Sequence, residues 1–150
     1  MIVLLSPARS GGTLIAKILK ELTGKPVHRT HLAQYTKDGK HLKTDGKDIL
    51  LTDIEYLFFV SREPLENAAS KICFDNFSQI QEKIIYQVFL NSCHGAQMLA
   101  GFILLWLTHS WTVFSKYKNK KYVIQYKNLI NKEKVKHELA SLYQFFHEND

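Results

Sequence analysis

The sequence predicts an α/β fold of three layers, in which a mostly parallel sheet is flanked by helices on both faces. Short apolar runs typical of buried strands alternate along the chain with segments whose apolar residues recur at helical spacing. A glycine-rich turn, Ser6–Thr13, joins the first strand to the first helix, which is where a P-loop-like phosphate-binding loop is found. With 150 residues, 45% of them hydrophobic and 23% charged, the chain predicts a single domain over residues 1–150.

The first part of the chain supplies the elements on either side of this turn. The apolar run 2–5 predicts a strand. Residues from about Thr13 to Leu22 predict a helix, which Gly24 and the following proline end. Residues 27–32, VHRTHL, predict a short strand with a polar end.

Residues 35–48 hold two Asp-Gly pairs and four lysines. Because Asp-Gly pairs mark turns, this segment predicts a solvated loop or a hairpin. A second interpretation is a loop that contacts an acceptor or another acidic partner, since its lysines are cationic.

The second half of the chain continues the alternation. Residues 54–63, IEYLFFVSRE, predict a central strand covered on both faces, and Pro64 suits the first turn of a following helix. Residues 121–126, KYVIQY, predict another strand. Three more helices are predicted: one marked by Ile80, Ile84, Ile85, Val88 and Phe89, one over 96–116, and one marked by Val135, Leu139, Leu142 and Phe146.

The segment 96–114, AQMLAGFILLWLTHSWTVF, is about long enough to cross a membrane. It contains several polar residues, clustered toward one end, among them Gln97, Thr108 and His109. This pattern favours a helix in a protein core, with one end near solvent, and we expect no membrane span.

Charge and cysteine content narrow the classes of ligand and compartment. The net charge of +6 favours an anionic ligand such as a nucleotide, an acidic glycan, nucleic acid or a membrane surface. Neither an aromatic-basic ladder nor a helix-turn-helix pattern supports nucleic acid. The two cysteines form no CxxC pair, so no metal site is expected, and without a signal-peptide pattern the chain is expected to be cytoplasmic.

Functional residues are expected where the strands end, because ligands of open parallel sheets bind beyond the carboxyl ends of the strands. After the first strand, the backbone N–H groups of Ser10, Gly11, Gly12 and Thr13 can cradle an oxyanion, aided by the helix dipole. Arg9 lies inside the same loop and can stabilise charge on a transferred group or on its leaving oxygen. The simpler interpretation is a glycine-rich turn with a surface arginine.

The next two strand ends add further candidates. Arg29 and His31 are two residues apart, so on a strand they point to the same side, as a cation beside a general base. Arg62 is followed eight residues later by Ser70, in the next helix, and both can contact one phosphate. Taken alone, Arg29 and His31 are better explained as two surface residues, and Ser70 as an ordinary serine on a helix surface.

Together these segments resemble the sulfotransferases that use 3′-phosphoadenosine 5′-phosphosulfate (PAPS). PARSGGT is similar to their P-[KR]-S-G-T-T loop, and RTHL to their K-T-H-L-P segment. FFVSREPLENAASKICF resembles their R-[DN]-P-x-D-x-x-x-S segment with the same spacing from arginine to serine. YVIQYKNLINKEKVKHELASLYQFF resembles their late strand, Y-E-D-L turn and helix, so the resemblance runs from Ile2 to about Phe146.

The resemblance implies a function for each candidate residue. Arg9, Ser10, Gly11, Gly12 and Thr13 would bind the 5′-phosphosulfate of PAPS, while Arg62 and Ser70 would bind its 3′-phosphate. Arg9, Arg29 and His31 would be catalytic, with His31 as the base that removes the acceptor proton. The product would be 3′-phosphoadenosine 5′-phosphate (PAP), and no metal would be needed.

Sulfuryl transfer from PAPS to a hydroxyl or amine is therefore the predicted activity. Two alternatives stay open: a non-catalytic nucleotide- or anion-binding module on the same fold, and a kinase with an altered phosphate-binding loop. We expect the acceptor to be a small molecule or a glycan, and the lysines of residues 35–48 favour an acidic acceptor. A homo-oligomer is compatible with the sequence.

Overall fold

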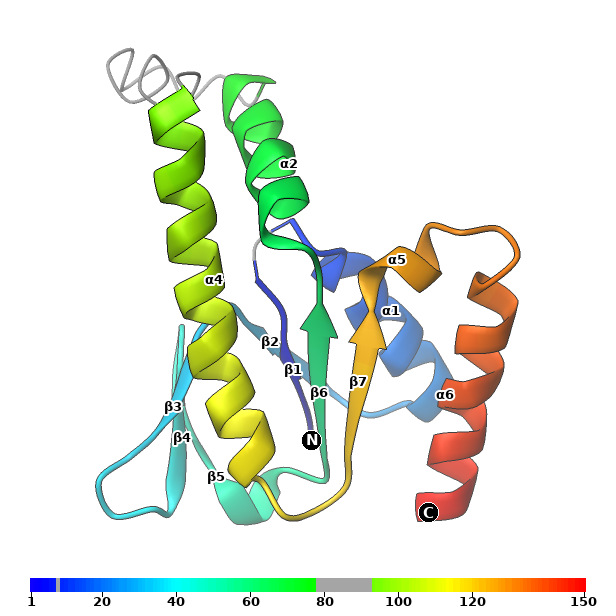
Figure 1. Ribbon diagram of the computed structural model, residues 1–150. Helices are drawn as coiled ribbons and strands as arrows, with labels where there is room; N and C mark the ends of the chain where they lie inside the picture. Colours follow the sequence, from blue (N-terminus) through cyan, green and yellow to red (C-terminus); the bar gives the residue numbers. More distant parts are fainter. Residues whose placement is uncertain (8, 78–92) are drawn as a thin grey trace.

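Four parallel strands form the central sheet of the computed structural model, which describes residues 1–7, 9–77 and 93–150. Their order across the sheet is β2-β1-β6-β7 (Figure 1). The strands are β1 (Ile2–Leu5), β2 (Val27–Thr30), β6 (Tyr56–Ser61) and β7 (Lys121–Gln125). The predicted α/β class with a parallel sheet is confirmed, and β6 is an inner strand as expected.

Helices lie between β1 and β2, between β6 and β7, and after β7, and all but the short α5 lie at or near predicted positions. They are α1 (Gly12–Thr23), α2 (Pro64–Phe77), α4 (Cys93–Lys116), α5 (Tyr126–Leu129) and α6 (Val135–Asn149). Gly24, at φ +67°, ends α1, as the sequence predicts. The helix predicted around Ile80–Phe89 lies outside the described residues.

Both faces of the sheet are covered. Because side chains alternate along each strand, every strand contributes residues to the packing on both faces. Ile2, Leu4 and Phe58 pack against α1 and α6 on one face. Val3 and Phe59 pack on the other face, against α4 and a smaller sheet. Figure 1 shows α1 and α6 on one side of the strands and α4 on the other, so the layers are helix, sheet and helix.

The segment predicted as a loop or hairpin forms a separate antiparallel sheet of β3 (Ala33–Tyr35), β4 (His41–Thr44) and β5 (Asp48–Leu50). Gly39, at φ +68°, permits the turn before β4. Leu42 and Ile49 are buried against the core that the central sheet shares with α4. The hairpin interpretation is therefore the correct one.

One stretch of α4, Gln97–Lys116, has the length and composition of a membrane span, and a third of it is buried. It is the single such stretch in the described part of the chain. Val113, Phe114 and Tyr117, at and just beyond its end, lie in the core beside the sheet. A helix of a protein core satisfies the same length and composition test, so this finding is consistent with the expected absence of a span.

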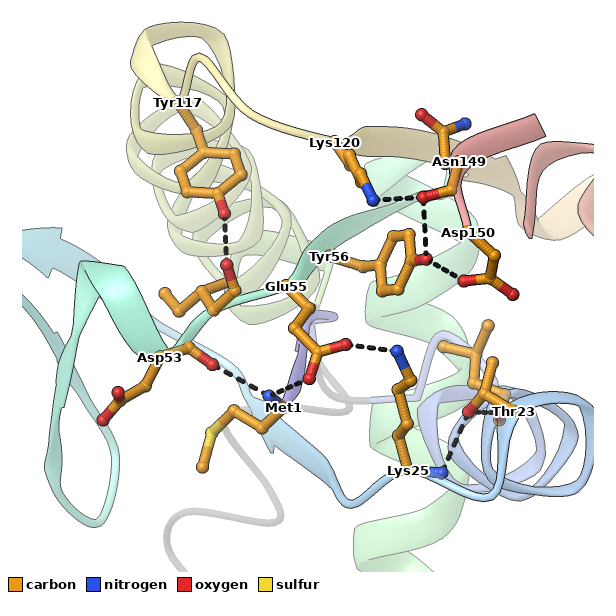
Figure 2. A network of polar contacts seen from close by, with 12 residues as sticks. Met1, Thr23, Lys25, Asp53, Glu55, Tyr56, Tyr117, Lys120, Asn149 and Asp150 are labelled. Carbon is orange, nitrogen blue, oxygen red and sulfur yellow. Dashed lines mark hydrogen bonds and ion pairs between the residues drawn. The ribbon is translucent and has the colours of Figure 1, made fainter. Parts of the chain in front are cut away.

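A polar network joins chain segments at the amino ends of the strands (Figure 2). The amino group of Met1 donates a hydrogen bond to the Asp53 carbonyl at 2.8 Å, and Glu55 pairs with Met1 and with Lys25. The Tyr56 hydroxyl donates to Asp150 at 2.5 Å. The amino ends of the strands lie opposite their carboxyl ends, so the network stabilises the fold away from the candidate site.

Candidate functional site

A cavity of about 660 Å³ lies at the carboxyl ends of all four parallel strands. The first residue after each strand lines it: Ser6 after β1, His31 after β2, Arg62 after β6 and Tyr126 after β7. Its walls also hold Pro7, Arg9, Gly11, Gly12, Thr13, Leu14, Arg29, Ser70 and Lys71. The described lining therefore includes three arginines and a lysine but neither Asp nor Glu, and this composition favours an anionic ligand.

The loop between β1 and α1 presents backbone donors to this cavity. Gly11, at φ +76°, precedes α1, and the first hydrogen bond of the helix runs from the Ile15 amide to the Gly11 carbonyl at 2.9 Å. The amides of Gly12 and Thr13 therefore have no partner within the helix. Together with the helix dipole, these N–H groups suit an oxyanion.

Gly12 has no room for a side chain. A Cβ atom at this position would lie 2.5 Å from the Ser6 Oγ and 2.9 Å from the Arg29 Cδ. Ser6 is 1% exposed, and its Oγ has no hydrogen-bond partner among the described residues. A buried hydroxyl without a partner on the wall of a cationic cavity is suited to bind a ligand oxygen.

Ser10, for which the sequence predicts an anion contact through the backbone N–H, does not line the cavity with its side chain. It is fully buried, and its hydroxyl donates a hydrogen bond to the Pro7 carbonyl at 2.6 Å. Through its side chain, Ser10 therefore holds the loop in shape. Only its backbone N–H is left for the predicted contact with an anion.

Arg29 and His31 line the same cavity, although the strand is shorter than predicted. β2 ends at Thr30, whose hydroxyl bonds to the Leu32 carbonyl, and the His31 amide donates to the Asp45 carboxylate at 2.6 Å. The Arg29 guanidinium donates to the Thr13 hydroxyl, which joins β2 to the start of α1.

The ring of His31 has one defined hydrogen bond. Its Nδ1 lies 2.8 Å from the Ser6 carbonyl oxygen. Because a carbonyl only accepts, Nδ1 carries the proton, and Nε2 is the basic nitrogen of the neutral ring. An imidazole fixed in this tautomer can remove a proton from a bound group.

Arg62 is held by two partners on the cavity wall. Its guanidinium stacks over the Tyr126 ring, 4.1 Å from the ring centroid, and donates to the Arg9 carbonyl. Its Nε is buried without a partner among the described residues. Since Arg9 has a left-handed backbone at φ +60°, which costs energy outside glycine, the bond from Arg62 helps to hold this loop.

Ser70 lines the cavity from α2, as does the next residue, Lys71. Arg62 and Ser70, which the sequence pairs by their spacing, thus line the same cavity, together with a further cation, Lys71. Of the predicted site residues, all but Ser10 line this cavity.

Sequence reasoning did not select Ser6, Lys71 or Tyr126 as site residues. Tyr126 stacks on Arg62 and lies close to Gly11, where a Cβ atom would be 3.1 Å from the ring. Ser6 and Tyr126 both directly follow a strand. Taking the residue after the first predicted strand as a candidate would have found Ser6, whereas Tyr126 was predicted as the last residue of its strand.

Comparisons with protein-family models, with curated proteins and with solved structures found no match to this chain. The resemblance of its motifs to those of the sulfotransferases therefore stays a prediction. What bears on function is the arrangement of cations, backbone donors and His31 around one cavity.

Proposed function

We propose that the chain transfers a sulfuryl group from PAPS to a hydroxyl or amine of an acceptor and releases PAP. The observation that carries this proposal is one cavity that brings together a helix amino terminus, three arginines with a lysine, and a histidine of defined tautomer. Its volume of about 660 Å³ lies in the range of nucleotide and drug-sized ligands.

The loop Ser6–Thr13 is P-loop-like in this proposal and holds the 5′-phosphosulfate. The amides at the start of α1 and the Ser6 hydroxyl bind its oxygens, and Gly12 provides the space between them. Arg9 and Arg29 stabilise negative charge on the transferring group and on the leaving phosphate oxygen. PAPS supplies an activated sulfuryl group on a phosphate leaving group.

The 3′-phosphate occupies the wall formed by Arg62, Ser70 and Lys71. The Arg62 fork has five N–H donors, of which the Arg9 carbonyl takes one, so others can reach a phosphate. The Ser70 hydroxyl adds a further hydrogen bond. This second cationic wall fits a nucleotide with a phosphate on its ribose as well as on its 5′ oxygen.

His31 acts as the base toward the acceptor. Its Nε2 takes the acceptor proton as the acceptor oxygen or nitrogen forms a bond to sulfur. The bond between sulfur and the bridging oxygen breaks, and the electron pair leaves with the 5′-phosphate of PAP. The Ser6 carbonyl, which accepts a hydrogen bond from Nδ1, orients the ring.

The lining also favours this proposal over a kinase. Magnesium in nucleotide sites is bound through carboxylates together with phosphate oxygens. The described lining offers cations but neither Asp nor Glu, which suits a donor that needs no metal. A binding module without turnover has the same cavity, so only an activity measurement separates it from an enzyme.

Transfer of radiolabelled sulfate from PAPS to a panel of phenols, amines and glycans tests the proposal. We expect a labelled product, and in Arg9→Ala both slower turnover and weaker PAP binding, since Arg9 lies inside the loop. Tight PAP binding without transfer to any acceptor would indicate a binding module. Absence of both would refute the assignment.

A further inference from the structure

The turn between β4 and β5 meets the end of the strand that leads to the proposed base. This turn contains the second Asp-Gly pair of residues 35–48, Asp45 and Gly46. The Asp45 amide donates to the Thr30 hydroxyl at 3.1 Å, and the Asp45 carboxylate accepts from the His31 amide at 2.6 Å. Two hydrogen bonds of opposite direction therefore join one turn residue to the last residue of β2 and to the residue after it.

β2 is an outer strand of the central sheet, so it pairs with another strand, β1, on one side. The register of this pair ends at Leu5 and Thr30. Backbone groups along the open side of an outer strand have no strand to pair with. The carboxylate of Asp45 supplies the acceptor for the amide of His31, directly after the strand. A residue of the separate antiparallel sheet thus holds the backbone that carries the proposed base.

The ring of His31 depends on where its backbone lies. The Ser6 amide donates to the Thr30 carbonyl at 3.0 Å, and the Ser6 carbonyl accepts from the His31 Nδ1 at 2.8 Å. The imidazole turns only about the bonds that join it to the backbone. Its contact with Ser6 therefore requires the His31 backbone to stay in place, and Asp45 binds that backbone.

The two Asp-Gly pairs of the antiparallel sheet use their carboxylates differently. Asp38, in the turn between β3 and β4, accepts from the Thr36 hydroxyl at 2.5 Å and from the Lys40 amide at 3.0 Å. These bonds stabilise its own turn, as aspartates in turns commonly do. The carboxylate of Asp45 binds His31, which lies 14 residues earlier in the chain. Turn formation accounts for the bonds of Asp38 but not for that of Asp45.

We propose that Asp45 is a positioning residue for His31, and that the antiparallel sheet serves the reaction by holding the proposed base. The inference rests on the proposed function. Asp45 is not among the described residues that line the cationic cavity, so it acts through His31 rather than on the nucleotide. While Asp45 holds the backbone, Nδ1 stays bonded to the Ser6 carbonyl, and Nε2 stays the basic nitrogen.

The test compares Asp45→Ala and Asp45→Asn in the full chain, with Asp38→Ala as the matched control. The control removes the same charge from the other Asp-Gly turn of the same sheet. Asp45→Asn keeps a side-chain oxygen that can accept from the His31 amide, whereas Asp45→Ala removes it. The sheet should stay in place in each variant, because Leu42 and Ile49 anchor it in the core.

The first measurement is nitrogen-15 NMR of the histidine rings in basic buffer, with the His31 signals assigned by their loss in His31→Ala. In wild type, Nδ1 should carry the proton, in agreement with its bond to the Ser6 carbonyl. Asp45→Ala should give a mixture of the two tautomers, because the displaced ring no longer keeps this bond. Asp45→Asn and Asp38→Ala should keep the wild-type signals.

The second measurement is steady-state sulfate transfer. Asp45→Ala should lower kcat by about 10–10²-fold, the loss that a misplaced catalytic group causes, with KM and PAP affinity nearly unchanged. Asp45→Asn and Asp38→Ala should keep most of the turnover. Added to His31→Ala, Asp45→Ala should cause no further loss, because a residue that acts through His31 has no effect once His31 is absent.

Two results would overturn the inference while the proposed function stands: an unchanged tautomer of His31 in Asp45→Ala, or a clear further loss of turnover when Asp45→Ala is added to His31→Ala. The proposed function fails separately, if wild type neither binds PAP nor transfers sulfate. The NMR measurement does not depend on turnover, so in that case it still decides whether Asp45 positions the ring of His31.

Discussion

At the scale of single residues, the hydrogen bond of His31 determines its chemistry. The Ser6 carbonyl fixes the proton on Nδ1, and the ring lines the cavity that holds the proposed donor. His28, on the same strand, is placed differently. Its Nε2 lies 2.9 Å from the Thr44 hydroxyl, and burial, followed by Lys47, lowers its pKa. His28 is not among the residues that line the cavity.

We therefore expect His31→Ala to lower turnover by about 10²–10⁴-fold, the usual contribution of a general base. Affinity for PAP should stay nearly constant, because the base acts on the acceptor. His28→Gln is the control and should keep most of the activity. Steady-state sulfate transfer and calorimetry measure the two quantities. Wild-type turnover in His31→Ala would show that the base lies elsewhere.

The 3′-phosphate is best tested at Ser70, because Arg62 has a second role. Arg62 holds the Arg9 carbonyl and stacks on Tyr126, so Arg62→Ala should weaken every nucleotide that uses the loop. Ser70→Ala should weaken the binding of PAP by about 1.5–3 kcal/mol, the range of a hydrogen bond to a charged group. It should not change the binding of adenosine 5′-phosphosulfate, which lacks the 3′-phosphate. Equal losses for both ligands would place the 3′-phosphate away from Ser70.

At the scale of elements, the junction of β1 and α1 requires glycine, which has no side chain, at position 12. Gly12→Ala adds a methyl group 2.5 Å from the Ser6 Oγ, so Ser6 or Arg29 must shift. The backbone of Gly12 is helical and alanine favours helices, so the fold should persist. We expect a loss of PAP affinity of at least about tenfold, with a melting temperature close to that of wild type.

The opposite pattern should appear at the other end of the same helix. Gly24 has φ +67° and open space around it, so Gly24→Ala costs about 1–2 kcal/mol of stability through the left-handed backbone alone. PAP affinity should be unchanged. Thermal melting and calorimetry on both variants check this contrast, and a similar loss of affinity in Gly24→Ala would mean that the Gly12 effect is one of general stability.

Elements with strong patterns were predictable, and contacts between distant elements were not. The apolar runs of β1 and β6 and the stop at Gly24 follow from local chemistry, and the structure has them where predicted. The antiparallel sheet spans residues 33–50, of which residues 35–48 were predicted only as a loop or hairpin. Its buried side chains are isolated, such as Leu42 and Ile49, and depend on packing against the central core.

The same distinction holds in the candidate site. Strand ends located Arg29, His31 and Arg62 on one cavity, because parallel strands place their carboxyl ends at one edge. The inward turn of Ser10 and the stacking of Tyr126 on Arg62 were not predictable. Both depend on partners that only the folded chain brings near.

At the scale of the whole molecule, the two ends of the parallel strands differ. The cationic cavity lies at the carboxyl ends of the strands, while the network of Figure 2 lies at their amino ends. Tyr56 belongs to that network, and burial, followed by its bond to Asp150, raises its pKa from 10.0 to about 12. Lys25 and Lys120 lie over its ring at 5.2 and 5.3 Å.

The raised pKa of Tyr56 predicts that the protein loses stability at high pH. Because the pKa of Tyr56 is higher in the folded state, its contribution is complete below pH 10 and is lost as the pH rises toward 12. The advantage in melting temperature of wild type over Tyr56→Phe should therefore shrink across this range. Comparing the two proteins removes the effect of the two lysines, because both proteins contain them and both titrate them. A constant advantage would show that the pKa of Tyr56 is not raised.

The central claim is that the cavity at the carboxyl edge recognises a nucleotide with two separate phosphate positions. Titration calorimetry with PAP, with AMP and with ATP plus magnesium, accompanied by thermal melting, tests this claim most directly. We expect PAP to bind most tightly and to raise the melting temperature most, because only the folded chain has the site. AMP should bind more weakly, since it lacks the 3′-phosphate that we propose contacts Arg62, Ser70 and Lys71, which line the cavity. Equal or greater stabilisation by ATP with magnesium, or no binding of PAP, would contradict the claim.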